Sequence, residues 1–143
     1  ANILINPLNQ EIRIIDFDIS SFLKKDNQFI ENSNTMKGTI PYISPEQTGR
    51  MSRSIDYRSD LYSLGITFFQ LLSGTIPFPS DDINQVIHSH IALSPPDLHD
   101  MNDSIPKVVS SIIMKLLEKA PENRYLSCTS LKNDLIHCQE EWT

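Results

Sequence analysis

Three things are scarce in this sequence: long apolar runs, cysteine and basic residues. No apolar stretch approaches the roughly 20 residues that a membrane helix needs, and no signal-peptide pattern is present, so we expect no membrane segment. Cys128 and Cys138 are too few for a disulfide-stapled scaffold and are compatible with a reducing cytoplasm. The formal net charge of -6 argues against a nucleic-acid partner, because phosphate binding needs clustered Lys and Arg.

What is present fits one ordinary domain. The 143 residues are 39% apolar and 21% charged, enough to bury a core. The chain starts on ANILI without a Met, and we expect it to be a piece of a longer protein. Two short β-branched runs, 2–5 and 11–15, flank the turn signal Asn6-Pro7 and predict a hairpin. Residues 23–37 then form a long polar loop without periodicity, which is typical of lids and binding loops.

Four helices are predicted after this loop. The first opens on Ser59-Asp60, is apolar on nearly all sides and ends at the capping residue Gly74, so we expect it to lie at the domain centre. Ser80 is the predicted N-cap of the second, which ends before Ser94. The others run from Ser104 to Lys119 and from about Ser127 onward. The predicted class is α+β and mostly helical.

No zinc site is expected. His88 and His90 are two residues apart, which does not place them on one helix face. They, together with the scattered His99 and His137, are interpreted as surface or packing residues, and the two cysteines lack a metal-ligand spacing.

An ordered set of short motifs runs through the chain, namely Asn2-Ile3-Leu4, Asp16-Phe17-Asp18, Gly38-Thr39 with Tyr42, Ser44-Pro45-Glu46, Asp60 with Tyr62-Ser63-Leu64-Gly65, and Arg124. In order and rough spacing, this set resembles the C-terminal lobe of eukaryotic-type protein Ser/Thr kinases. The stretch SPEQTGRMSRSIDYRSDLYSLG is most similar to kinase domains heading large bacterial multi-domain sensor kinases. The resemblance implies a partial kinase domain over 1–143, with an activation and substrate-binding loop over 17–46 and a helical subdomain over 59–143.

The resemblance implies ATP and Mg²⁺ as cofactors, with Asn2 and Asp16 at the family's metal-binding positions. Both side chains offer oxygen ligands, which suit a hard cation, and both flank the predicted hairpin. The alternatives are a turn amide for Asn2 and a strand-end turn residue for Asp16. Asp18 departs from the family, which usually has glycine there, and it is expected to restrict movement of this segment.

The predicted loop carries further implied roles. Thr39 matches the threonine that contacts the catalytic aspartate and positions a hydroxyl substrate; the alternative is an ordinary loop residue. Ser33 and Thr35 lie where the family often carries a regulatory phosphate, which orders a loop against basic side chains. Exposed hydroxyls of this kind are otherwise simply solvated.

Three more residues have implied structural roles. Glu46 and Arg124 match an ion pair that ties the loop to the helical part. Asp60 matches an aspartate that accepts hydrogen bonds from the catalytic-loop backbone, and a helix N-cap is the competing interpretation. Gly65 costs about 1 kcal/mol in a helix relative to Ala, so we expect close packing there.

A working kinase also needs a Gly-rich loop, a strand lysine and a catalytic aspartate, and none of these lies in the sequence. We therefore expect this chain alone to be inactive, and its partners to be a missing N-terminal lobe, downstream signalling domains and a protein substrate. The implied function is the C-terminal part of an ATP-dependent Ser/Thr kinase in cytoplasmic signal transduction. The alternatives are a pseudokinase or regulatory binding module, favoured by Asp18, and an unrelated helical binding domain.

Overall fold

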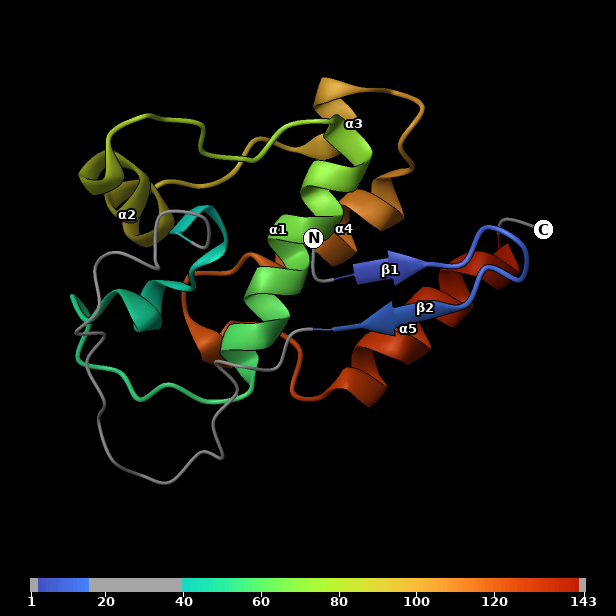
Figure 1. Ribbon diagram of the computed structural model, residues 1–143, viewed down its shortest axis with the longest axis horizontal. Helices are drawn as coiled ribbons and strands as arrows, with labels where there is room; N and C mark the ends of the chain where they lie inside the picture. The colour runs from blue at the N-terminus through green and yellow to red at the C-terminus, as the bar shows by residue number, and fades with distance from the viewer. Residues whose placement is uncertain (1–2, 16–39, 142–143) are drawn as a thin grey trace.

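The fold is a small hairpin followed by a helical body (Figure 1). This computed structural model describes residues 3–15 and 40–141. The elements in chain order are β1 (Ile3–Ile5), β2 (Ile12–Ile14), η2 (Ile40–Tyr42), η3 (Pro45–Thr48), α1 (Arg58–Ser73), α2 (Ile83–Ala92), α3 (Leu98–Met101), α4 (Lys107–Leu116), η4 (Pro121–Asn123) and α5 (Cys128–Glu141), where η marks a 3-10 helix. The predicted mostly helical α+β class is confirmed.

The predicted hairpin is confirmed. β1 and β2 pair antiparallel, with Ile3 opposite Ile14 and Ile5 opposite Ile12. The turn is closed by the Asn6 N–H, which donates to the Glu11 carbonyl at 2.9 Å. Every residue from 3 to 15 is exposed, including the apolar ones. A two-stranded hairpin of this kind is marginal alone and needs a surface to pack against.

Helix α1 crosses the middle of the helical body, and α2 lies on the far side of α1 from the hairpin (Figure 1). The end of α1 lies where the sequence predicts it. Gly74 adopts a φ of 78° there and donates its N–H to the Gln70 carbonyl. The expectation of burial all round is wrong for the last turn, where Leu71 and Leu72 are exposed. The helix also begins at Arg58 rather than at Ser59.

The remaining helices differ from the predictions at their ends. Asp82, not Ser80, is the N-cap of α2, and its carboxylate accepts from the Asn84 N–H at 2.9 Å. The helix predicted over 104–119 is limited to Lys107–Leu116, and the short α3 was not predicted. Within the part of the chain that the structure describes, no helix is long and apolar enough to cross a membrane.

Two apolar clusters meet along α1. The first comprises Tyr62, Ile66, Phe69, Leu98, Ile105, Ile113 and Leu117. The second comprises Leu61, Ile112, Leu116, Tyr125, Leu131 and Cys138. Gly65 lies where α1 approaches α4, and a Cβ added there would be 2.8 Å from the Cβ of Leu116. The expected close packing at Gly65 is therefore confirmed.

Candidate functional site

A buried ion pair lies at the centre of the candidate site. Nη1 of Arg124 is 2.7 Å from Oε1 of Glu46, and Nη2 is 2.8 Å from Oε2, so the two groups meet in a bidentate pair. Each residue is only 2% exposed. The Ser59 hydroxyl donates a third hydrogen bond to Oε1 at 2.7 Å. The pair connects the segment after the long loop to the end of the helical body, 78 residues further along the chain.

The environment keeps both charges satisfied. Burial alone would raise the pKa of Glu46, but the hydrogen bonds from Arg124 and Ser59 outweigh it and hold this pKa below its ordinary value. The guanidinium also donates to three backbone carbonyls, those of Glu118, Arg58 and Lys119, at 2.8, 2.9 and 3.2 Å. A buried charge without such partners would strongly destabilise the fold.

Helix α1 anchors the segment that follows Thr39. In η2, the Tyr42 hydroxyl donates to Oε1 of Gln70 at 2.6 Å, and the Tyr42 carbonyl accepts from the Ser63 hydroxyl at 2.8 Å. Ile40 is buried. Residues 40–48 are therefore fixed at both ends, by α1 through Tyr42 and by Arg124 through Glu46.

Asp60 lies in the first turn of α1 as its third residue. The N-cap interpretation is wrong, because Tyr57 occupies that position and Asp60 is inside the helix. Its carboxylate makes no hydrogen bond or ion pair with any of residues 3–15 or 40–141. Neighbouring protein atoms remove part of its hydration and raise its pKa.

The other predicted site residues, namely Asn2, Asp16, Asp18, Ser33, Thr35 and Thr39, lie outside the described residues. The hairpin register does constrain how the chain reaches two of them. Because Ile3 pairs with Ile14, the two chain ends that lead to Asn2 and Asp16 leave the hairpin at the same end. Among the described residues alone, no group of three or more His, Cys, Asp or Glu side chains could hold a metal ion.

Sequence reasoning missed two partners of the buried polar groups. Ser59 was expected only to open the helix, yet its hydroxyl binds Glu46. His90 was placed among surface or packing residues, and it is fully buried with Nδ1 at 2.9 Å from the Tyr62 hydroxyl. The neighbouring letters of the sequence carry no signal for either contact, because both partners come from distant parts of the chain.

Comparison with known proteins identifies the class. Residues 1–136 match the protein kinase domain family, which covers nearly the whole chain. The chain belongs to this family, and the helical body with its short hairpin is a C-terminal kinase lobe.

Similar proteins fall into two groups. The chain is 46% identical over 120 residues to hybrid signal transduction histidine kinase G of Dictyostelium discoideum, and 40% identical over 114 residues to the peroxide stress-activated histidine kinase mak3 of Schizosaccharomyces pombe. These matches cover 84% and 80% of the chain. It is 31% identical over 140 residues, 98% of the chain, to serine/threonine-protein kinase PknB of Mycolicibacterium smegmatis. The chain spans only 4%, 5% and 22% of the lengths of these relatives.

Proposed function

We propose that the chain is the C-terminal part of an ATP-dependent protein serine/threonine kinase domain acting in signal transduction. In the complete domain, the γ-phosphate of ATP would pass to a Ser or Thr hydroxyl of a protein substrate. The observation that carries the proposal is the buried Glu46–Arg124 pair, which fixes residues 40–48 directly after Thr39. The mycobacterial relatives, named as Ser/Thr kinases, support the choice of acceptor.

Phosphoryl transfer depends on positioning and charge neutralisation more than on covalent chemistry by the protein. Thr39 would position the substrate hydroxyl. The segment that follows it is firmly anchored, because Tyr42 and Glu46 are both hydrogen-bonded to the helical body. The carboxylate of Asp60 would accept hydrogen bonds from the backbone of a catalytic loop that carries the base. Each of these roles requires rigidity, which the buried pair provides.

Asn2 and Asp16 would hold Mg²⁺. An amide oxygen and a carboxylate are suitable donors for this hard cation, and the hairpin register directs the chain toward both from one end. The bound Mg²⁺ would neutralise charge on the ATP phosphates. Ser33 and Thr35 remain proposed phosphorylation sites in the activation loop.

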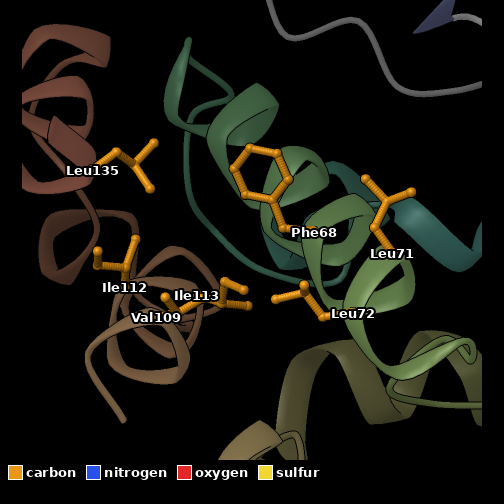
Figure 2. Close-up of a pocket in the computed structure, with 7 residues that line it drawn as sticks. All are labelled: Phe68, Leu71, Leu72, Val109, Ile112, Ile113 and Leu135. Carbon is orange, nitrogen blue, oxygen red and sulfur yellow. The ribbon is translucent and has the colours of Figure 1, made fainter. Parts of the chain in front are cut away.

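Two exposed apolar surfaces support a larger domain as the functional unit. One is the hairpin, and the other is a groove of about 210 Å³ between α1, α4 and α5. Figure 2 shows the side chains that line it, namely Phe68, Leu71, Leu72, Val109, Ile112, Ile113 and Leu135. We propose that the missing N-terminal part of the kinase domain covers these surfaces and that further signalling domains follow it. The two free cysteines are compatible with a cytoplasmic location.

The proposal is tested with the complete parent protein, incubated with Mg-ATP and a peptide library containing Ser, Thr and Tyr acceptors. We expect phosphate on Ser and Thr, loss of transfer in the Asp16→Asn variant, and no transfer by the 143-residue chain alone. Transfer by the isolated chain, or retained transfer in Asp16→Asn, would contradict the assigned roles.

A pseudokinase or regulatory binding module is the second candidate, and the observation that favours it is Asp18 in the position where the family usually has glycine. If the parent protein binds no Mg-ATP and the Asp18→Gly variant does, this candidate is correct. Binding by the unmodified protein favours the kinase.

A further inference from the structure

A series of hydrogen-bonded, buried polar groups joins three parts of the helical body near η2. Tyr62 of α1 and His90 of α2 are both fully buried. The Tyr62 hydroxyl is 2.9 Å from Nδ1 of His90 and 3.5 Å from Nζ of Lys119, which follows α4. Nζ of Lys119 also donates to the Ser89 carbonyl at 3.3 Å and lies 4.6 Å from the centre of the Phe78 ring. Only the Lys119 carbonyl, which accepts from Arg124, belongs to the site described above; the side chains of Tyr62, His90 and Lys119 have no role there yet.

The direction of the hydrogen bonds among Lys119, Tyr62 and His90 follows from the chemistry of lysine. A protonated amine can only donate, so the Tyr62 oxygen accepts from Lys119 and its own proton is left for Nδ1 of His90. Lys119 keeps its proton at neutral pH even though burial, followed by the nearby Arg124 charge, lowers its pKa to about 8. His90 is neutral, because burial and then the Lys119 charge lower its pKa to about 4. A neutral imidazole that accepts at Nδ1 carries its proton on Nε2.

The Nε2 atom then needs an acceptor. It is buried and has no hydrogen-bond partner among the described residues. Helix α2, which carries His90, contacts η2, and the backbone of Pro41 in η2 raises the pKa of the imidazole. Since proline has no N–H, the interacting group is the carbonyl. Pro41 is the middle residue of η2, two positions after Thr39.

We propose that His90 is a positioning residue, held as the Nε2–H tautomer by Lys119 and Tyr62 and directing that proton to the Pro41 carbonyl. It would hold η2 against α2, whereas the bonds of Tyr42 hold η2 against α1. The consequence for phosphoryl transfer rests on the proposed function, in which the segment after Thr39 presents the protein substrate. The tautomer itself does not depend on that function.

The first test measures the tautomer by NMR. In the 143-residue chain at pH 7, the ring ¹⁵N and ¹³Cδ2 shifts of His90 should report a neutral imidazole with its proton on Nε2. The Lys119→Met variant removes the group that sets the direction and should give a mixture of tautomers. An Nδ1–H tautomer or an imidazolium in the unmodified chain would overturn the proposal, as would an unchanged population in Lys119→Met. If the chain aggregates, the same shifts are measured in the complete parent protein.

The second test separates the two ring nitrogens. Gln at position 90 places an amide donor near the Nε2 position, whereas Asn places an amide near Nδ1 and leaves the Nε2 position empty. In the parent kinase, His90→Asn should raise KM for the protein substrate about fivefold through loss of one hydrogen bond, with KM for ATP unchanged. His90→Gln should stay close to the unmodified enzyme.

Equal KM changes in the two variants, or equal effects on both substrates, would reduce His90 to a packing residue and contradict the proposal. If the parent transfers no phosphate at all, the proposed function fails, and the tautomer measurement alone decides the role of His90.

Discussion

Glu46 and Arg124 show what a single contact does in this chain. Both side chains are almost completely removed from water, and a charge in that environment is tolerated only when it is paired and hydrogen-bonded. The surface pairs differ, because exposed ion pairs compete with water and contribute about 0–1 kcal/mol. Arg53 and Glu122 form such a pair, with both side chains more than one-third exposed.

Arg124→Met should therefore lower the free energy of unfolding by about 3–5 kcal/mol, because Glu46 would remain buried without its partner. Ser59→Ala removes one hydrogen bond to the same carboxylate and should cost about 1.5–3 kcal/mol. Urea unfolding monitored by circular dichroism measures both. Arg53→Met is the matched control and should cost less than about 1 kcal/mol. Similar losses for Arg124→Met and Arg53→Met would contradict the importance of burial.

His90 makes stability depend on pH. Its pKa is about 4 in the folded chain, below the ordinary 6.5, so the unfolded chain takes up a proton first as the pH falls. Stability should consequently be about 2 kcal/mol lower at pH 5 than at pH 7. Unfolding in urea at a series of pH values measures the change, and His90→Gln should flatten it.

Other titratable groups with a shifted pKa do not cause a comparable loss of stability between pH 7 and pH 5. The pKa is lowered for the carboxylates of Glu46, Asp56, Asp97 and Glu122, so these groups titrate below pH 5. The raised pKa of Asp60 acts in the opposite direction, since the folded state then binds the proton more tightly. A pH profile that stays steep in His90→Gln would assign the effect to another group.

At the scale of the elements, α1 approaches α4 closely at Gly65. A methyl group there would be 2.8 Å from the Cβ of Leu116 and 3.0 Å from Cδ2 of Leu117. The first of these atoms belongs to the rigid base of a side chain, so it can move only with the backbone of α4.

Gly65→Ala should destabilise the chain. Overpacking costs about 1–3 kcal/mol, while the better helix propensity of alanine offsets at most about 1 kcal/mol. Thermal unfolding gives the loss, and the methyl resonances of Leu116 and Leu117 should shift. Gly74→Ala is the control, because its φ of 78° makes alanine unfavourable there although no atom lies within 4 Å. It should lose stability without moving those resonances; unmoved resonances in Gly65→Ala would exclude a steric cause.

The elements were predictable from the sequence where a local rule decides them. The hairpin follows from two β-branched runs around Asn6-Pro7, and the end of α1 follows from Gly74. The predicted N-cap of α2 was wrong because Ser80 and Asp82 are both good capping residues. Asp82 is the cap, and the Ser80 hydroxyl oxygen instead accepts a hydrogen bond from the Asp82 N–H. Which of two capping residues only two positions apart is used depends on the path of the preceding chain.

The site was predictable only in part, and for a different reason. Glu46 and Arg124 could be paired because an ordered set of motifs resembles a family, whereas their separation of 78 residues gives no local signal. Ser59 and His90 belong to no such motif, and their partners are set by how α1, α2 and η3 pack. The N-cap interpretation of Asp60 failed because α1 begins two residues earlier, at Arg58.

On the scale of the whole molecule, the surface exposes many large apolar side chains. Large apolar side chains line the groove between α1, α4 and α5, and more are exposed along the hairpin. Contiguous apolar patches of this kind normally mark a surface that another part of a protein covers. Leu71 lines the groove, and 71% of its surface is exposed. Leu126 lies outside the groove and is equally exposed, at 70%, so it serves as the control residue.

Leu71→Ser should have little effect on the 143-residue chain, because the side chain it removes is already exposed to water. In the parent protein, where we propose that the N-terminal part of the kinase domain covers the groove, the same change should cost about 2 kcal/mol or more through lost apolar burial. Leu126→Ser should change neither protein by more than about 0.5 kcal/mol. Urea unfolding of the two variants in both chains measures the difference. Equal, small effects of Leu71→Ser in the short and long chains would mean that the groove stays open, and the covering of this face would then have to be abandoned while the Glu46–Arg124 anchor would be unaffected.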